Sequence, residues 1–397
     1  MRTVTIRFGL SLLCIFFLFS SHVAAAEQTG DSQPLSDEQK MEQVREYFKS
    51  EFQEEDYFRT DRLLLTATKR NLPMRKAPAI ATVITQEEIR YMGARNLRDV
   101  LAMVPGVGVA RNEFGVFMYE VRGIRTQLSE KILLMIDGHS VNKSIITGSA
   151  LYRIFDDIPV KNIKQIEIIR GPGSALYGAN AFVAVINIIT RNAVDISGIE
   201  VSGSYGDFET GNINIVGGKI FKNGFQISGS VDYFNTAGER FSIERDFLTE
   251  FPPLAPFNFS AAPGYAYTEI EKTDIFLKAS YKDLAFKGHY MSNQRDAFYI
   301  GFNHVLTDDS TDPITNYWAE LSYSPKLSDR LQATFKTYID FYEQDTSAEI
   351  FPEGYTDFGL GLTYPNGVIV EPKVKNQTIG AELQLDYDPS PANHLVV

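Results

Sequence analysis

A glycine-rich turn, residues 171–178 (GPGSALYG), is the first place in this 397-residue chain to look for phosphate or nucleophile chemistry. A phosphate-binding loop ends in Gly-Lys-Ser/Thr and opens a long helix, and neither feature follows here. Ser174 has no G-x-S-x-G frame and no evident base, so a nucleophilic serine is not predicted either. Glycine and proline in this stretch are typical of a tight turn inside a compact domain.

Metal and cofactor chemistry is not predicted. The histidines are scattered without the spacing of a metal triad, and His139 is interpreted as a turn residue. The acidic run Asp308–Asp312 could attract a calcium ion, although a solvated loop is the preferred interpretation. No paired catalytic groups are recognisable, so the chain is predicted not to be an enzyme and to need no cofactor or metal.

Residues 1–26 have the form of a secretory signal peptide, with Arg2 and Arg7 before a short apolar run and alanines at 24–26. Cys14, the only cysteine, lies inside it, so the mature chain has no disulfide. Losing the two arginines takes the formal charge from −12 to −14, which argues against nucleic-acid binding. An exported chain rich in Tyr and Phe, without an apolar helix, is either a soluble periplasmic protein or an outer-membrane barrel.

Two polar segments precede the globular part. Residues 27–60 are acidic, and Ser36 with Gln39 can form a capping box before apolar residues at helical spacing. This pattern is compatible with an amphipathic helix and equally with a loosely ordered, solvated arm. Residues 61–70 then carry a short apolar β-prone run between charges. Such an extended peptide can add to the sheet edge of a partner through its backbone.

Residues 71–192 are predicted to form a small α+β domain. Thr85 and Glu88 make a capping box for a helix that Gly93 ends, and Asn96 can cap a second helix. Asp137-Gly138 is a tight-turn signal. Strands are predicted at 107–110, 119–124, 131–136, 163–169 and 183–189.

Residues 193–397 change to a period of two, which is typical of antiparallel strands with two different faces. The alternation alone also fits a soluble sandwich. A membrane barrel is favoured because Tyr and Phe recur near strand ends, and because short turns alternate with long loops. The short turns are predicted at 219–224, 281–283, 324–329 and 389–394, and the long loops at 235–271, 293–316 and 343–375.

Several motifs of the sequence also resemble those of a known protein family. IEIIRGPGSALYGANAFVAVINIIT, residues 166–190, closely resembles the signature near the end of the plug domain of TonB-dependent outer-membrane receptors. TQEEIRYMGARNLRDVLAMVPGV, YEVRGIR and ILLMIDGHSVN resemble earlier plug motifs in the family's order, so the resemblance covers residues 61–192. It implies an α+β plug domain followed by antiparallel transmembrane β-barrel strands.

The resemblance also implies roles for particular residues. The segment at the position of the TonB box, on its tether 61–70, is expected to bind TonB through Leu63, Leu64, Leu65, Thr66, Ala67 and Thr68. Arg122, Glu167 and Arg170 match charged plug positions and are expected to contact the barrel. The expected ligand-binding plug tips contain Arg111, Asn112 and Phe114 in one loop and Asn142, Lys143 and Ser144 in another.

The implied function is energy-coupled uptake of a scarce nutrient, most often a ferric siderophore, otherwise haem, cobalamin or a glycan. The implied partners are TonB with its inner-membrane energising complex. The implied location is the Gram-negative outer membrane, with the plug and the N-terminus facing the periplasm.

The predicted strands are fewer than such a receptor needs. We predict about eight strands, with a ninth beginning near His394. A plugged barrel of this family has about 22 strands. Residues 193–397 are therefore expected to be the N-terminal part of a barrel, and the chain an N-terminal fragment of a longer receptor. The alternatives are a plug-containing periplasmic interaction module or remnant without transport activity, and a passive porin-like channel.

Overall fold

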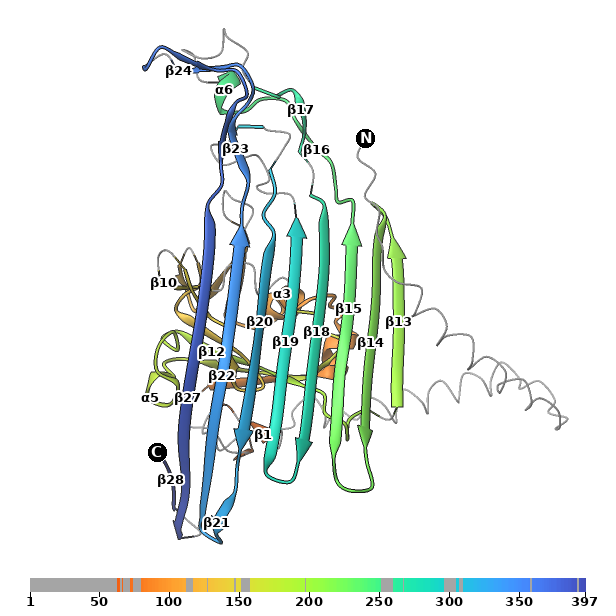
Figure 1. Cartoon of the computed structure of the whole chain (residues 1–397), viewed down its shortest axis with the longest axis vertical. Coiled ribbons are helices and arrows are strands. Elements are labelled where there is room, and N and C mark those ends of the chain that lie inside the picture. The colour runs from red at the N-terminus through yellow and green to blue at the C-terminus, as the bar shows by residue number, and fades with distance from the viewer. Residues whose placement is uncertain are drawn as a thin grey trace, which may run out of the picture. The chain divides into compact units, whose positions relative to one another are not determined.

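The computed structural model describes two connected bodies, an α+β domain and a long antiparallel sheet (Figure 1). No helix in the part of the chain described is long and apolar enough to cross a membrane. The predicted leader, the predicted arm with its Ser36–Gln39 capping box, and most of the tether lie outside the described residues. Those residues are 63–64, 66, 72–73, 80–111, 117–126, 128–145, 148–150, 158–196, 198–250, 260–266, 268–295, 305–306, 310–357, 359–390 and 393–397.

The centre of the α+β domain is a five-stranded sheet in the order β3-β11-β12-β7-β8. Strands β12 and β7 are parallel, and the other neighbours are antiparallel. Both of these strands are buried almost throughout, as their unbroken apolar runs require. The bounds are β3 (Ile80–Thr85), β7 (Ile132–Ile136), β8 (His139–Ser140), β11 (Ile163–Arg170) and β12 (Ala184–Thr190).

Two short helices cover this sheet. The predicted capping box of Thr85 and Glu88 is present and opens α2 (Gln86–Tyr91), and Gly93 follows with a φ of +66°. Asn96 accepts a hydrogen bond from the Asp99 N–H and opens α3 (Leu97–Ala102). The apolar face of α3 is completely buried in the domain core, so its stability comes from packing rather than from its length.

One predicted strand is wrong in its extent. The run 119–124 was expected to be continuous, but it divides into β5 (Phe117–Val121) and β6 (Ile124–Arg125). Arg122 and Gly123 both have positive φ, at 52° and 80°, which is the backbone of a two-residue hairpin turn. Strand β4 (Val107–Arg111) pairs with β5 to complete a three-stranded sheet.

The second body is a single antiparallel sheet whose main strands follow one another in chain order. Its ninth strand begins at Asn393, next to the predicted start near His394. Within the described residues the sheet is open, with β13 and β28 at its edges. The strands are β13 (Gly198–Gly206), β14 (Thr210–Ile220), β15 (Gln226–Thr236), β18 (Ile270–Tyr281), β19 (Leu284–Arg295), β20 (Ile314–Tyr323), β22 (Leu331–Asp345), β27 (Lys373–Ser390) and β28 (Asn393–Val396), with β21 (Lys326–Ser328) beside β22.

The two faces of this sheet have opposite chemistry. The face toward the α+β domain, which we call the wall, carries buried charged side chains such as Asp232, Asp274 and Glu320. The outward face carries exposed apolar side chains such as Leu277 and Leu321. A polar interior with an apolar exterior is the arrangement of a transmembrane β-barrel, and it is the reverse of a soluble sandwich.

The long loops carry short elements of their own, listed here: β16 (Phe241–Ile243), α6 (Phe247–Glu250), β17 (Gly264–Ala266), β23 (Ala348–Phe351), β24 (Tyr355–Asp357), β25 (Leu362–Tyr364) and β26 (Val368–Val370). Asp312 corrects the prediction of a solvated loop at 308–312, because it is fully buried and accepts hydrogen bonds from Gln344 and Thr346. Asp308 and Asp309 lie outside the described residues.

Replacing Leu101 by alanine should lower the free energy of unfolding of the α+β domain by about 2–5 kcal/mol, because a fully buried leucine leaves a cavity. Met103→Ala is the matched control: Met103 is 65% exposed and should change stability by no more than about 0.5 kcal/mol. A urea titration followed by hydrogen exchange of the domain measures both. Equal losses for the two variants would contradict the assigned core.

Candidate functional site

Thr66 is enclosed by the α+β domain and has no exposed surface. Its N–H and its hydroxyl both donate to the same carboxylate oxygen of Glu167, the first at 2.7 Å. The Tyr177 hydroxyl donates to the Thr66 carbonyl at 2.7 Å, and Nδ2 of Asn187 donates to the Thr66 hydroxyl at 3.1 Å. We call Glu167, Tyr177 and Asn187 the handle site, and residues 63–68 the handle.

The domain sheet sets the geometry of the handle site. Glu167 on β11 and Asn187 on β12 are cross-strand partners. Asn187 interrupts the apolar run of β12, and Glu167 lies between two isoleucines of β11. Tyr177 comes from α5 (Ser174–Tyr177), which lies inside the predicted glycine-rich turn. Burial raises the pKa of Tyr177, and the negative charge of Glu167 raises it further. The phenol therefore stays protonated and remains a donor to Thr66.

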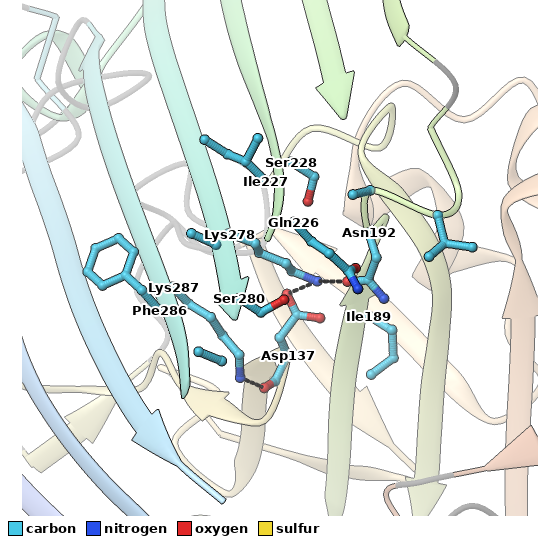
Figure 2. Close-up of a pocket in the computed structure, with 14 residues that line it drawn as sticks. Asp137, Ile189, Asn192, Gln226, Ile227, Ser228, Lys278, Ser280, Phe286 and Lys287 are labelled. Carbon is cyan, nitrogen blue, oxygen red and sulfur yellow. Dashed lines mark hydrogen bonds and ion pairs between the residues drawn. The ribbon is translucent and has the colours of Figure 1, made fainter. Parts of the chain in front are cut away.

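A second cluster joins the domain to the wall at the turn Asp137-Gly138 (Figure 2). The Asp137 carboxylate pairs with the Lys278 ammonium at 2.8 Å, and the Asp137 carbonyl accepts from Lys287 at 2.8 Å. Lys278 also donates to the Thr190 carbonyl and to the Asn192 side chain. Two lysines from adjacent strands, β18 and β19, thus hold one turn of the domain.

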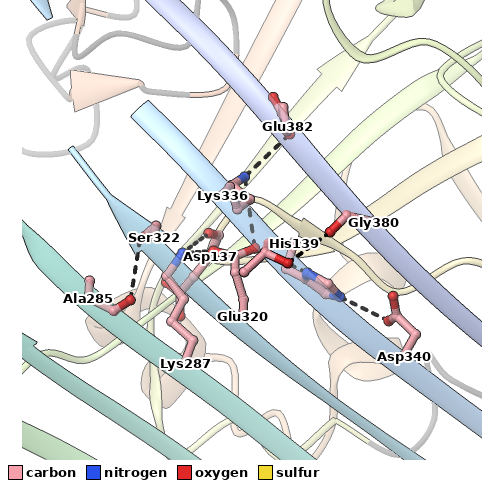
Figure 3. A network of polar contacts seen from close by, with 12 residues as sticks. Asp137, His139, Ala285, Lys287, Glu320, Ser322, Lys336, Asp340, Gly380 and Glu382 are labelled. Atoms are coloured by element: carbon pink, nitrogen blue, oxygen red, sulfur yellow. Dashed lines mark hydrogen bonds and ion pairs between the residues drawn. The ribbon is translucent and has the colours of Figure 1, made fainter. Parts of the chain in front are cut away.

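His139 extends this cluster to β20 and β22 (Figure 3). Its ring nitrogens lie 3.1 Å from a Glu320 oxygen and 3.0 Å from an Asp340 oxygen. Both ring nitrogens therefore face a carboxylate of the wall. The ring is also stacked on Trp318, with 4.1 Å between ring centroids. The interpretation of His139 as a simple turn residue is therefore incomplete: it follows the turn, in β8, and is buried against the wall.

Lys143 supplies a third link. Its ammonium lies 2.7 Å from Asp340, and the side chain is only 3% exposed. Burial lowers the pKa of Lys143, while the charge of Asp340 acts in the opposite direction. Buried charges of this kind are tolerated when each meets an opposite charge and further hydrogen bonds. We call Asp137, His139 and Lys143 with their partners Lys278, Lys287, Glu320 and Asp340 the plug–wall network.

A cavity of about 360 Å³ lies between the domain and the wall beside this network, as Figure 2 shows. Lys278, Lys287 and Asp137 line it together with Asn192 and Ser228. The charged groups at its edge are already paired with one another. Among the described residues, no group of three or more metal-capable side chains could hold a metal ion.

The predicted TonB-binding segment is only partly described. Leu63 and Leu64 form β1 (Leu63–Leu64), which pairs with β2 (Leu72–Pro73), and Thr66 occupies the handle site. Leu65, Ala67 and Thr68 lie outside the described residues. TonB binding by this segment stays a prediction.

The three predicted plug–barrel residues have other contacts in the structure. Glu167 faces Thr66 and Gln165. Arg170 donates to the Pro105 carbonyl and to the Thr82 hydroxyl, and Arg122 sits at positive φ in the β5–β6 turn. Their contact with the barrel stays a prediction.

The predicted ligand-binding tips are placed as follows. Arg111 ends β4, while Asn112 and Phe114 lie outside the described residues. Ser144 is in β9 (Lys143–Ile145), paired with β10 (Gly148–Ala150). Asn142 bonds the backbone of Ile132 and Leu134, and Lys143 pairs with Asp340. Ligand contact at these positions stays a prediction.

Sequence reasoning missed Asn187, Asp137 and the wall residues as site residues. A local signal existed for Asn187, because one amide in a strand of valine and isoleucine must find buried partners. The wall residues gave no such signal. Lys278 or Glu320 on an alternating strand is equally compatible with a solvated face.

A small α+β domain is held by buried ion pairs against the polar face of an antiparallel sheet, and the other face of that sheet is apolar. This is the arrangement of plugged outer-membrane barrels. Comparisons with known proteins agree. Residues 73–185 match the family model described as TonB-dependent Receptor Plug Domain; the predicted bounds 71–192 stay a prediction. The vitamin B12 transporter BtuB of Vibrio vulnificus is 34% identical over 169 residues, which are 41% of this chain and 26% of that protein.

Solved structures share the fold. The siderophore receptor PiuA of Acinetobacter baumannii has a TM-score of 0.53 at 18% identity, over 80% of this chain and 44% of that one. A ferric enterobactin receptor, PfeA of Pseudomonas aeruginosa, gives 0.52 at 15% identity, over 81% and 48%. The chain therefore spans less than half the length of these relatives. Its α+β domain matches the plug domain of TonB-dependent receptors and is called the plug below. The fold of the described chain is shared with the two receptor structures.

Replacing Asp137 by asparagine should weaken the plug's attachment by about 3–5 kcal/mol, because it leaves the Lys278 side chain, which is only 14% exposed, without its ion-pair partner. The control is Lys164→Met, which breaks the Lys164–Asp195 pair, whose lysine is 45% exposed, at a cost of about 0–1 kcal/mol. Hydrogen exchange of residues 131–145 across a urea series reports both. A cost for Asp137→Asn no greater than that of the control would refute the network's role.

Proposed function

We propose that this chain is part of an outer-membrane receptor that takes up a scarce nutrient with energy supplied through TonB. The observation that carries the proposal is the buried handle site next to a plug that is ion-paired to a barrel wall. Receptors of this family are outer-membrane proteins, and the matched relatives are named as transporters or receptors rather than enzymes. The plug and the N-terminus would face the periplasm, where TonB reaches.

The ligand class is proposed from the relatives. They are named for vitamin B12, a siderophore and ferric enterobactin. A ferric siderophore is our first proposal for this chain and cobalamin the second, with haem a further member of the same class. The long loops and the plug tips would hold the ligand on the outer side.

The mechanism follows from the handle site. Thr66 is held by hydrogen bonds to a carboxylate, a phenol and an amide. A ligand that favours a plug state in which these bonds are weaker would free the handle. TonB could then pair with the extended handle by strand addition, and the inner-membrane complex would supply the pull that opens a path past the plug.

The alternative of a periplasmic interaction module has less support. A soluble module would have to keep the outward face of nine strands, with side chains such as Ile199 and Ile379 more than 70% exposed, in contact with water. Apolar patches of that extent are normally covered by lipid or by protein.

Deleting residues 63–68 in the intact receptor should abolish uptake while surface binding of the ligand persists, because the deletion removes the strand that TonB would engage. Uptake and binding of a labelled ferric siderophore, and separately of cobalamin, measure the two steps. A proline at Thr66 is the point-substitution version, since proline lacks the N–H that pairing needs. Unchanged uptake in both variants would reject the mechanism.

Glu167→Gln should expose the handle without ligand, because a neutral amide replaces a carboxylate that accepts two hydrogen bonds from Thr66. Bonds to a charged acceptor contribute about 1.5–3 kcal/mol, which corresponds to roughly a tenfold to hundredfold rise in handle opening. Protease cleavage within the handle measures this opening. Glu87→Gln, at an exposed position on α2, should leave the cleavage rate unchanged, and an equal rise there would argue against a specific effect.

A further inference from the structure

Asn187 touches both the handle and the turn that holds the wall. Its Nδ2 donates to the Thr66 hydroxyl at 3.1 Å, and its Oδ1 accepts from the Gly138 N–H at 3.1 Å. The residue is 2% exposed. A single side chain therefore bridges two places that are 72 residues apart in sequence.

The hydrogen bonds run in one direction. The Gly138 N–H donates to the Asn187 carbonyl oxygen, the Asn187 amide donates to Thr66, and the Thr66 hydroxyl donates to Glu167. Buried chains of this kind strengthen one another because each bond polarises the next. Turning the amide by half a turn would set its NH₂ against the Gly138 N–H, so only one orientation fits.

The far end of this chain is the plug–wall network. Gly138 lies between Asp137 and His139, the two residues that pair with Lys278 and with Glu320 and Asp340. The turn is attached to β12 at two further places: the Asp137 N–H donates to the Ile188 carbonyl, and the Asp137 carboxylate accepts from Thr190. A displacement of Asn187 thus acts on a turn whose two flanking side chains hold the wall.

We propose that Asn187 is a coupling residue that links occupancy of the handle site to the plug–wall network. When Thr66 leaves, Asn187 loses the partner of its NH₂ group in a dry interior, which costs about 1–3 kcal/mol unless the amide moves. The amide can move only by giving up Gly138. Coupling between two sites is reciprocal, so loosening the wall contacts favours release of the handle to the same extent.

This inference goes beyond the proposed function, because it concerns contacts within the plug and between the plug and the wall, and it holds whether or not TonB is the partner. The test is therefore made on the intact receptor without TonB and without ligand. Hydrogen exchange is read in the segment that contains Thr66 and in the segment 131–145. Failure of uptake experiments would not affect this readout.

Lys278→Met loosens the wall contacts without touching the handle. It should raise exchange at Thr66 by about fivefold or more, the lower range of measured couplings. In the background of Asn187→Leu, which has nearly the same shape but no amide, the same Lys278→Met change should have no further effect at Thr66. Persistence of the full rise in that background would overturn the proposal.

Asn142→Leu is the matched control. Asn142 also makes one donor and one acceptor bond inside the plug, to Ile132 and Leu134, but it does not contact Thr66. This variant should lower stability and still keep the effect of Lys278→Met at Thr66. Loss of that effect in both asparagine variants would show a general loosening instead and would overturn the assignment to Asn187.

A reverse measurement covers the case in which Asn187→Leu does not fold. Thr66→Val removes only the hydroxyl that Asn187 and Glu167 contact. It should raise exchange of the turn around Gly138 by the same fivefold or more, with no change in α3, which lies outside the hydrogen-bonded chain. An unchanged turn would equally refute the coupling.

Discussion

Charged groups on the wall can be removed from water only if a partner meets each of them. Glu320 is 1% exposed and contacts His139 of the plug as well as Lys287 and Lys336 of the sheet. Without the plug, Asp340 would lose Lys143 and His139, and without the sheet Asp137 would lose Lys278. Because removing one partner of a buried pair costs more than the pair contributes, plug and wall depend on each other for their buried state.

The outward face has the opposite requirement. Side chains such as Leu277 and Leu321 are apolar and 41% and 43% exposed. Lipid accepts such a face, but it does not accept the unpaired backbone of a sheet edge. The nine described strands leave two edges, and family barrels close theirs with about 22 strands. An apolar outer face and a polar inner face are therefore compatible with each other in a closed barrel, where no strand edge remains unpaired.

The handle site shows how a buried position can remain releasable. Thr66 is held by hydrogen bonds rather than by a large apolar side chain. Hydrogen bonds in a dry site are strong while they are complete and costly when one member leaves, which gives a sharp difference between the docked and the released handle. The same property makes Asn187 sensitive to events on either side of β12.

The sequence by itself determined the local elements and the order of the parts. The capping residues Thr85, Glu88 and Asn96, the Asp137-Gly138 turn and the period-two strands were predictable because caps, turns and alternation depend on neighbours within a few residues. The plug was recognisable from its motifs. The break at Arg122-Gly123 was missed because no Asn-Gly or Asp-Gly pair marks that turn.

Only the tertiary structure decided which residues form the site. Asp137 with Lys278, His139 with Asp340, and Asn187 with Thr66 and Gly138 are separated by 49 to 201 residues, and each charge alone looks like an ordinary surface residue. The face of the sheet on which each wall residue lies depends on strand register. A shift of one residue would turn Lys278 and Glu320 toward lipid and their apolar neighbours toward the plug. Register is set by the pairing of whole strands, so it was fixed by the assembled sheet and not by any local stretch of sequence.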